Sequence, residues 1–183
     1  MPSANVRAIQ QDDAGRLWLG LRNGGLCSLD GARWEWWTGA EGLPGTRITD
    51  LAFGAGGALW LGLEGWGVVR FDGATFRRLG NADDVTLTSK PSVAAGDSGR
   101  VLMAMGTPFD HATGCGLAWM DPDEKEIVRY LTADGLQSDS VRDLVLTADG
   151  RAWFTVAFSL ALHEFDGTAV RCHELPLTDH QGS

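Results

Sequence analysis

A short sequence element recurs at a nearly constant spacing along the 183 residues. The segment Gly15–Leu21, GRLWLGL, returns as GALWLGL at Gly57–Leu63, about 42 residues later. Weaker copies start at Gly99 and Gly150. A period of about 40 to 50 residues indicates that the chain is an array of similar structural units rather than one irregular fold. No other feature constrains the fold as strongly.

Two further elements keep the same order within the period. The first is an apolar residue followed by Asp and a turn residue: Leu29-Asp30-Gly31, Phe71-Asp72-Gly73, Met120-Asp121-Pro122 and Phe165-Asp166-Gly167. The second is an acidic residue followed by Gly-Leu, which appears as Glu41-Gly42-Leu43 and Asp134-Gly135-Leu136. Each of these two is followed at the same distance by Asp-Leu, at Asp50 and Asp143. Three elements in a fixed order favour a true repeat over coincidence.

Each copy divides into four short apolar segments separated by Gly or Asp-Gly turns, a pattern typical of antiparallel strands. The first strands are expected at Val6–Gln10, Ile48–Phe53, Pro91–Ala95 and Val141–Thr147. The sequence therefore predicts an all-β fold of β-propeller blades: four four-stranded antiparallel repeats, in an open or incomplete ring. The predicted domain is 1–183, with blades at about 5–45, 46–87, 88–137 and 138–177.

Tryptophan occupies the same place in the second strand of three copies, at Trp18, Trp60 and Trp153. A blade must bury both faces against its neighbours, so a large ring at this place is expected in the core. The Asp-Gly pairs are expected to form turns, because Gly adopts positive φ without steric cost. Neither set is a candidate for catalysis.

Charge and cysteine content exclude several classes of site. The net charge is −9, which disfavours nucleic acid as a partner. Cys27, Cys115 and Cys172 have no short spacing between them, so neither a disulfide framework nor a metal site is predicted, and no cofactor is implied. Met1–Arg7 lacks the apolar run of a signal peptide, and no segment has the length and apolar composition of a membrane span.

The first copy has a characteristic series of residues: Ile9, Asp12 or Asp13, Gly15, then Leu17-Trp18-Leu19-Gly20, and later Gly24-Gly25-Leu26 and Asp30-Gly31. This series resembles the two-component regulator propeller repeat. The resemblance implies a bacterial sensor region that takes part in signal transduction, with a periplasmic or extracytoplasmic location. The third copy departs from the pattern with Leu102 and Ala104, and the fourth with Ser159-Leu160-Ala161. No kinase segment is present, so kinase activity is not transferred.

In an antiparallel blade, the loop between strands two and three lies at the same end as the blade-to-blade linker. We call this end the loop face, and we expect ligand contacts there because binding residues concentrate on loops held by a rigid scaffold. The candidates are Arg22, Asn23, Glu64, Trp66, Phe109, Asp110, His111 and Phe158. Phe109, Asp110 and His111 belong to a loop that is about seven residues longer than its counterpart in copy two.

Three functions remain open at this point. The first is a non-catalytic propeller that binds a small molecule, glycan or protein on the loop face. The second is an enzyme similar to streptogramin lyase propellers, because Asp149–Thr155 resembles their repeat. His163 and Glu164 do not support it, since adjacent residues of a strand point to opposite faces. The third is a structural or assembly module. A ring completed by a second copy, giving a homodimer, is an alternative to an open arc.

Overall fold

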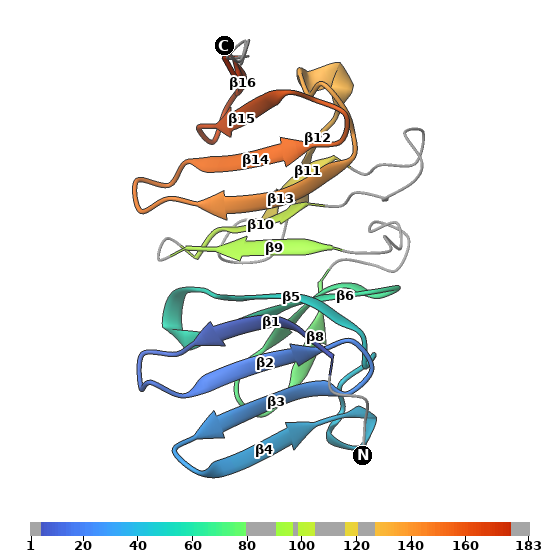
Figure 1. Ribbon diagram of the computed structural model, residues 1–183, viewed down its shortest axis with the longest axis vertical. Helices are drawn as coiled ribbons and strands as arrows, with labels where there is room; N and C mark the ends of the chain where they lie inside the picture. Colours follow the sequence, from blue (N-terminus) through green and yellow to red (C-terminus); the bar gives the residue numbers. More distant parts are fainter. Residues whose placement is uncertain (1–4, 80–90, 97–98, 105–115, 121–126, 177–183) are drawn as a thin grey trace, which may run out of the picture.

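The computed structural model describes residues 5–79, 91–96, 99–104, 116–120 and 127–176. Its sixteen described strands form four sheets of four strands each, and every pairing is antiparallel. In each sheet, neighbours in space are neighbours in sequence, as Figure 1 shows. We call the sheets blades 1 to 4. The prediction of an all-β fold with four four-stranded antiparallel repeats is confirmed.

The strand boundaries follow the repeat. Blade 1 contains β1 (Val6–Gln11), β2 (Leu17–Leu21), β3 (Gly25–Asp30) and β4 (Arg33–Trp37). Blade 2 contains β5 (Ile48–Phe53), β6 (Leu59–Leu63), β7 (Gly67–Phe71) and β8 (Phe76–Arg78). Blade 3 contains β9 (Ser92–Ala95), β10 (Val101–Ala104), β11 (Leu117–Met120) and β12 (Ile127–Tyr130). Blade 4 contains β13 (Val141–Leu146), β14 (Ala152–Val156), β15 (Ala161–Phe165) and β16 (Val170–Glu174).

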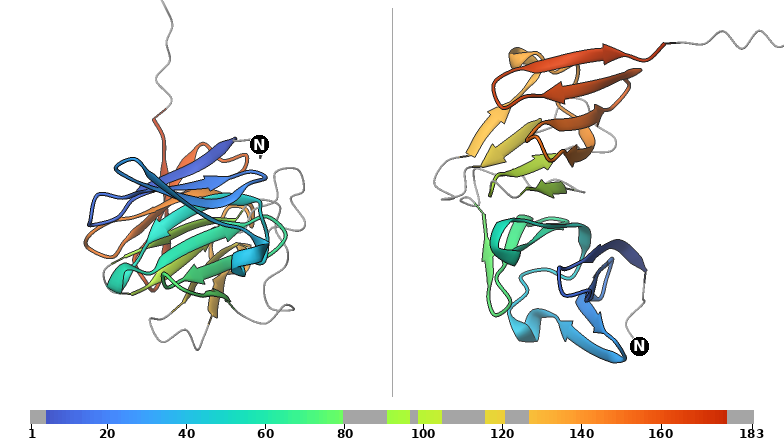
Figure 2. Two further views of the ribbon diagram at one scale, coloured as in Figure 1. Left: turned by 90° about the horizontal axis from the view of Figure 1, so that it is seen from below. Right: turned by 90° about the vertical axis from the view of Figure 1, so that its left-hand side faces the viewer.

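The blades succeed one another as an open fan. Blades 1 and 4 lie at opposite ends of the long axis, so the described strands do not close into a ring (Figures 1 and 2). The first strand of each blade lies innermost: β1 is next to β5, β5 is next to β9, and β9 is next to β13. These four strands therefore form the concave inner wall of the arc. The predicted open ring is confirmed.

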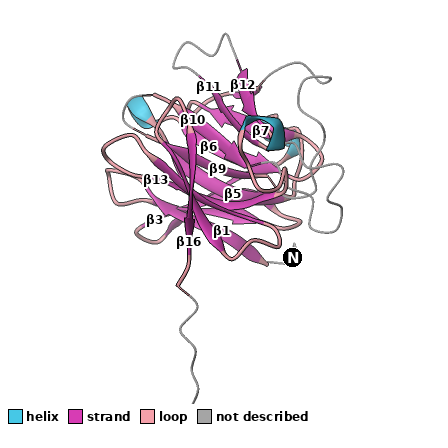
Figure 3. Ribbon diagram, turned by 90° about the horizontal axis from the view of Figure 1, so that it is seen from above, coloured by secondary structure: helices cyan, strands magenta, loops and turns pink. Residues whose placement is uncertain are grey.

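Helical structure in the described part of the chain is limited to three-residue 3-10 turns, η1 (Gly39–Glu41), η2 (Ala55–Gly57) and η3 (Thr132–Asp134) (Figure 3). None of these described helical segments has the length or apolar character needed to cross a membrane. The turns η1 and η3 lie in the linkers after blades 1 and 3, and each ends in a left-handed glycine, Gly42 or Gly135. This explains the recurring acidic-Gly-Leu element, since φ near +90° is costly for other residues.

Tryptophan packing between blades confirms two of the three predicted core positions. Trp18 is 7% exposed; its ring stacks on Trp37 with centroids 5.0 Å apart and meets the edge of Phe71 of blade 2 at 6.0 Å. Trp60 is equally enclosed, in the apolar cluster between blades 2 and 3. Each ring thus covers the next blade, as expected for a propeller core.

The prediction that Trp153 belongs to the core is wrong. Trp153 is in the same register position as Trp18 and Trp60. It pairs with Val145 of β13, as Trp18 pairs with Gln10 of β1 and Trp60 pairs with Ala52 of β5. Its side chain is only half-buried. Blade 4 is the last described blade, so no further blade covers this ring. In blade 3 the same position is Leu102, which is buried against blade 4.

The glycine after the Trp-Leu pair is required by close approach of the next blade. A Cβ at Gly20 would overlap Ile48, and a Cβ at Gly62 would overlap the carbonyl oxygen of Pro91. Blade 3 has Ala104 at this place and blade 4 has Thr155. The departures from the repeat pattern therefore reflect how closely the next blade packs.

Candidate functional site

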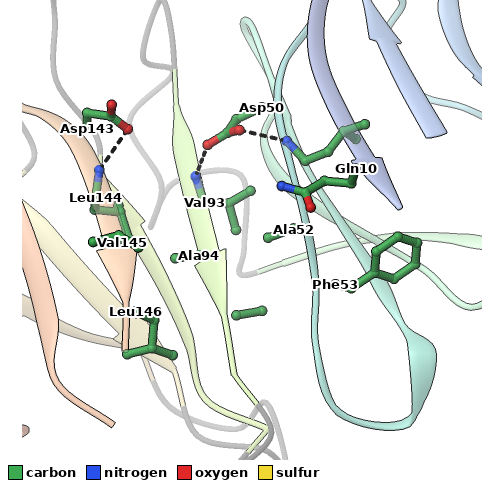
Figure 4. Close-up of a pocket in the computed structure, with 12 residues that line it drawn as sticks. Gln10, Asp50, Ala52, Phe53, Val93, Ala94, Asp143, Leu144, Val145 and Leu146 are labelled. Carbon is green, nitrogen blue, oxygen red and sulfur yellow. Dashed lines mark hydrogen bonds between the residues drawn. The ribbon is translucent and has the colours of Figure 1, made fainter. Parts of the chain in front are cut away.

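The concave inner wall of the arc contains a groove of ≈ 290 Å³. It is lined by one strand from each blade, and Figure 4 shows the side chains that face it. The lining residues are Gln10 from β1, Asp50–Phe53 from β5, Val93–Ala95 from β9 and Asp143–Leu146 from β13. Ala95 and Leu146 also border a second hollow that extends to Gly150. The groove therefore runs along the axis of the arc toward the turn end of the blades.

Two carboxylates lie at one end of this groove, those of Asp50 and Asp143 (Figure 4). Both come directly after a β-bulge in the innermost strand, after Ile48 in blade 2 and after Val141 in blade 4. A bulge bends a strand and redirects the side chain beside it. Because β5 and β13 begin at the blade-to-blade linkers, this end of the groove is the loop-face end.

Asp50 connects blade 2 to blade 3. Its Oδ2 accepts hydrogen bonds from the Ser92 hydroxyl at 2.5 Å and from the Val93 amide at 2.9 Å, and its Oδ1 accepts one from Leu51 N. Burial raises the pKa of the Asp50 carboxyl, and the charge of Asp143 acts in the same direction. Asp50 therefore mainly connects blade 2 to blade 3, and its carboxyl group also lines the groove.

Asp143 holds the equivalent position in blade 4 but is exposed. Its Oδ1 accepts a hydrogen bond from Leu144 N, as Asp50 does from Leu51 N. The sequence pattern marked Asp50 and Asp143 only as repeat positions, and neither was predicted as a site residue. Both are the third residue of the first strand of a blade, and this shared position near the loop face was the one signal in the sequence that pointed to them as site residues.

The predicted loop-face residues of blades 1 and 2 come together around one arginine. Arg47, in the linker between these blades, donates to Asn23 Oδ1 at 3.3 Å and forms an ion pair with Glu64 at 2.9 Å. Arg22 lies next to Asn23 and is exposed. The prediction that Asn23 and Glu64 share a face agrees with this geometry.

Trp66 is 40% exposed on the same face. The Arg78 guanidinium lies over its ring, 5.8 Å from the centroid. The indole also packs closely on the linker, because a Cβ at Gly45 would lie 2.6 Å from Trp66 Cδ1. Trp66 is therefore a fixed ring with one exposed part, rather than a free loop side chain.

Phe158, in the loop between β14 and β15, is the most exposed large apolar residue of the described part of the chain, at 80%. Its backbone is left-handed, with φ of 60°, and it is the one described non-glycine residue with positive φ. This conformation is uncommon for a bulky residue. The other predicted contacts, Phe109, Asp110 and His111, lie outside the described residues.

The histidines of blade 4 lie away from the groove. His163 is fully buried against Phe154, while Glu164 points to the other face of β15 and pairs with Arg151 at 2.6 Å and His173 at 2.9 Å. The prediction that His163 and Glu164 point to opposite faces is confirmed. Burial, together with the charge of His173, lowers the pKa of His163. Within the described ranges, no group of His, Cys, Asp and Glu is suited to hold a metal ion.

Comparison with known families gives a match at the start of the chain. The model of the two component regulator propeller family matches residues 1–23, which include β1 and β2. The first blade carries a two-component regulator propeller repeat. The resemblance predicted from Ile9 to Gly31 is confirmed for this blade. A search of curated protein sequences found no match to this chain.

Several solved structures have similar folds at low sequence identity. Virginiamycin B lyase from Staphylococcus aureus superposes with a TM-score of 0.73 at 14% identity, over 96% of this chain and 57% of the lyase. The extracellular domain of a putative one component system from B. thetaiotaomicron gives 0.71 at 14% identity, over 92% of this chain and 25% of that one. YCF48 bound to D1 peptide gives 0.65 at 17% identity, over 94% and 56%.

These comparisons show the propeller fold. The chain spans 57% or less of the first two neighbours, so it corresponds to a part of each of those structures. The neighbours include a lyase and a sensor domain, so their fold alone does not distinguish an enzyme from a binding module.

Proposed function

We propose that this chain is a non-catalytic recognition module that binds its ligand at the loop-face end of the axial groove. The observation that carries the proposal is the groove itself, which draws lining residues from all four blades and has Asp50 and Asp143 at one end. A concave site built on several rigid elements is the usual form of a small-ligand site. Its volume of ≈ 290 Å³ suits a compact group or one side chain of a peptide.

The charge of the site favours a cationic group on the ligand. Asp143 is exposed at the groove, and the chain carries a net charge of −9. A concave surface lined by one sign of charge concentrates ligands of the opposite sign. A lysine or arginine side chain, or a small amine, therefore fits this end of the groove better than an anion.

The loop face supplies two aromatic side chains for contact outside the groove. Trp66 is in contact with Gly45 and Arg78, and Phe158 has a strained backbone conformation. A rigid aromatic side chain supplies contact area at a low cost in conformational entropy. Backbone strain of this kind is concentrated at functional sites, so an exposed aromatic residue that carries it is a reason to look for function.

Two structural neighbours support recognition by proteins of this fold. One is the extracellular domain of a putative one component system, and the other is YCF48 bound to D1 peptide. We propose by analogy that this chain binds a small molecule, a glycan or a peptide segment of a protein, with the cationic group in the groove. As part of a sensor protein it would act outside the cytoplasm.

The runner-up function is a lyase, favoured by the superposition on virginiamycin B lyase. Among the described residues, the groove offers no imidazole: His163 is enclosed between blades and His173 pairs with Glu164 on the outer face of blade 4. Asp50 is engaged by Ser92 and by two backbone amides. General acid–base catalysis needs titrating groups within reach of the substrate, and in the described part of the groove Asp143 is left as a single exposed carboxylate without an imidazole beside it.

Isothermal titration with tri-lysine and tri-glutamate tests the proposal. Tri-lysine should bind with saturation and tri-glutamate should not. Asp143→Asn should weaken tri-lysine binding by roughly tenfold, the scale of a lost charge-assisted contact. Asp13→Asn is the matched control, because Asp13 is an exposed carboxylate in the β1–β2 turn, at the opposite end of the blade. Equal effects of the two variants would reduce the interaction to general charge attraction and contradict the proposed site.

Incubation of the chain with quinupristin, followed by mass spectrometry, distinguishes the lyase. Quinupristin is the compound in the structure of a catalytically inactive virginiamycin B lyase variant. Unchanged quinupristin is expected. Conversion that stops when His173 is replaced by Gln would overturn the non-catalytic assignment.

A further inference from the structure

The outer face of blade 1 is an uncovered apolar sheet face. It presents Ile9, Leu17, Trp34 and Trp36, which are 58%, 37%, 49% and 43% exposed. The two tryptophan rings stack on each other with centroids 6.1 Å apart. Large contiguous apolar patches of this kind usually mark an interaction surface.

The same positions are buried where a neighbouring blade is present. In the strand registers, Ile9 pairs with Leu19 as Leu51 pairs with Leu61, and Leu17 pairs with Leu29 as Leu59 pairs with Phe71. Leu51, Leu59, Leu61 and Phe71 all lie in the apolar cluster between blades 1 and 2, each 1% exposed or less. The outer face of blade 1 therefore has the same apolar character as the face of blade 2 that packs against blade 1.

The outer face of blade 4 is the counterpart of that interface. Leu162 pairs with His173 as Leu26 pairs with Trp37 and as Leu117 pairs with Tyr130. Leu26 and Leu117 are fully buried by the next blade, whereas Leu162 and Trp153 are only half-buried. Asp143 likewise repeats Asp50, which ties its blade to the next one.

We propose that blade 4 of one copy packs on the outer face of blade 1 of a second copy. Applied twice by a two-fold axis, this contact makes an eight-bladed ring from two chains. A second copy is the favoured occupant because both halves of the contact are present in one chain, and because the molecule already forms the same contact three times between its own blades. The inference does not depend on the proposed ligand.

A closed ring of eight blades turns by about 45° per blade, which is within the range of known propellers. The axial groove then becomes part of a closed central channel.

Two polar residues on the outer face of blade 4 affect how closely this blade can pack against blade 1 of a second copy. Glu164 occupies a position held by Ser28, Arg70 and Trp119 in the other blades, so this place accepts polar groups within an interface. Thr155 occupies the place of Gly20, Gly62 and Ala104, where the next blade approaches most closely. Thr155 therefore limits the strength of the contact and offers a test of it.

Sedimentation equilibrium of the full chain tests the inference, since a dimer has twice the 19.6 kDa of the chain. Ile9→Lys on blade 1 and Leu162→Lys on blade 4 should each weaken dimerisation by at least roughly tenfold, because each places a charge inside the contact. Thr155→Ala, which copies blade 3, should strengthen it. Leu160→Lys is the control, because Leu160 is 69% exposed and lies in the β14–β15 loop, outside both faces. Circular dichroism of each variant verifies that the blades remain folded.

Two outcomes would overturn the inference. A chain that stays monomeric across the concentration range has no such contact. A dimer that Ile9→Lys dissociates and Leu162→Lys leaves intact joins two blade 1 faces to each other, so it is not the head-to-tail ring. Loss of the dimer in both lysine variants, with tri-lysine binding retained by the monomers, supports the ring and separates it from the ligand proposal.

Discussion

The Asp50 carboxylate of blade 2 accepts a hydrogen bond from the Ser92 hydroxyl of blade 3 at 2.5 Å, and another from the Val93 amide at 2.9 Å. This pair joins two innermost strands at the wall of the groove. Hydrogen bonds of this kind fix the position of one blade relative to the next, where apolar packing alone would allow sliding. The shape of the groove therefore depends on a polar contact between blades.

Replacement of Asp50 by Ala is expected to lower the free energy of unfolding by about 1–3 kcal/mol, because it leaves the Val93 amide and the Ser92 hydroxyl without their acceptor. Ser92→Ala should cost less, since the backbone amide bond to Asp50 remains. Urea unfolding of both variants measures the difference. Equal losses would show that the Val93 bond contributes nothing.

The same carboxyl gives a pH dependence of known sign. Burial raises the pKa of Asp50 in the folded chain above its unfolded value of 3.8, so the folded state favours the protonated form. The contribution of Asp50 to stability is therefore greatest below that value and is lost as the pH rises through the raised pKa. Asp50→Asn removes this titration, so the urea midpoint of the variant should change less between about pH 4 and about pH 7 than that of the unmodified chain. An unchanged slope would contradict the assignment.

The contribution of His163 to stability is expected to depend on pH in the opposite direction to that of Asp50. Its ring is enclosed between blades 3 and 4, and among the described residues neither ring nitrogen has a hydrogen-bond partner. Burial lowers its pKa, so the folded state resists protonation while the unfolded chain accepts it below about 6.5. The stability is therefore fully present above that value and falls as the pH decreases toward the lowered pKa. His163→Leu should reduce this loss, which unfolding experiments at about pH 7.5 and 5.5 can measure.

Gly62 tests the close approach of blades 2 and 3. Gly62→Ala places a Cβ against the carbonyl oxygen of Pro91 and is expected to destabilise the chain by about 1–3 kcal/mol, since the blades must move apart. Gly39→Ala is the matched control, because a Cβ there meets nothing within 4 Å. Its effect should remain within about 0.5 kcal/mol. A Gly62 variant as stable as the control would mean that the blades are less tightly packed than described.

Replacement of Phe158 by Gly is expected to change the stability of the fold and the affinity for the ligand in opposite directions. Its φ of 60° is strained for a bulky residue, so Phe158→Gly should stabilise the fold by about 0.5–1 kcal/mol. If the aromatic ring contacts the ligand, the same change should weaken ligand binding. Thermal unfolding and titration of one variant give both values. A variant that loses stability would show that the ring is held by packing rather than by function.

Much of the fold was predictable because the repeat determines which residues lie together. The spacing from Gly15 to Gly57 located the second strands, and the buried Trp18 and Trp60 were expected from it. Trp153 was wrongly placed in the core because an internal pattern cannot indicate which blade is last. The packing of a terminal blade depends on the neighbour that covers its outer face, and the repeat does not encode that neighbour.

The candidate site was less predictable. The loop-face position of Asn23, Glu64 and Trp66 results from antiparallel connectivity, whereas the bridging role of Arg47 depends on the angle between two blades. Asp50 and Asp143 were visible as repeat markers, but their convergence on one groove depends on bulges that the sequence pattern does not reveal. The sequence thus predicts which residues lie on the loop face, whereas the residues that line the groove depend on how the blades pack against one another.

Amide NMR mapping of tri-lysine binding tests the central claim most directly. Chemical-shift changes should concentrate in the innermost strands β5, β9 and β13 near Asp50, Val93 and Asp143, with smaller changes at Trp66 and Phe158 on the loop face. The outer strands β4, β8 and β16 should change little. Shifts confined to those outer strands, or spread evenly over the acidic surface, would contradict a binding site in the axial groove.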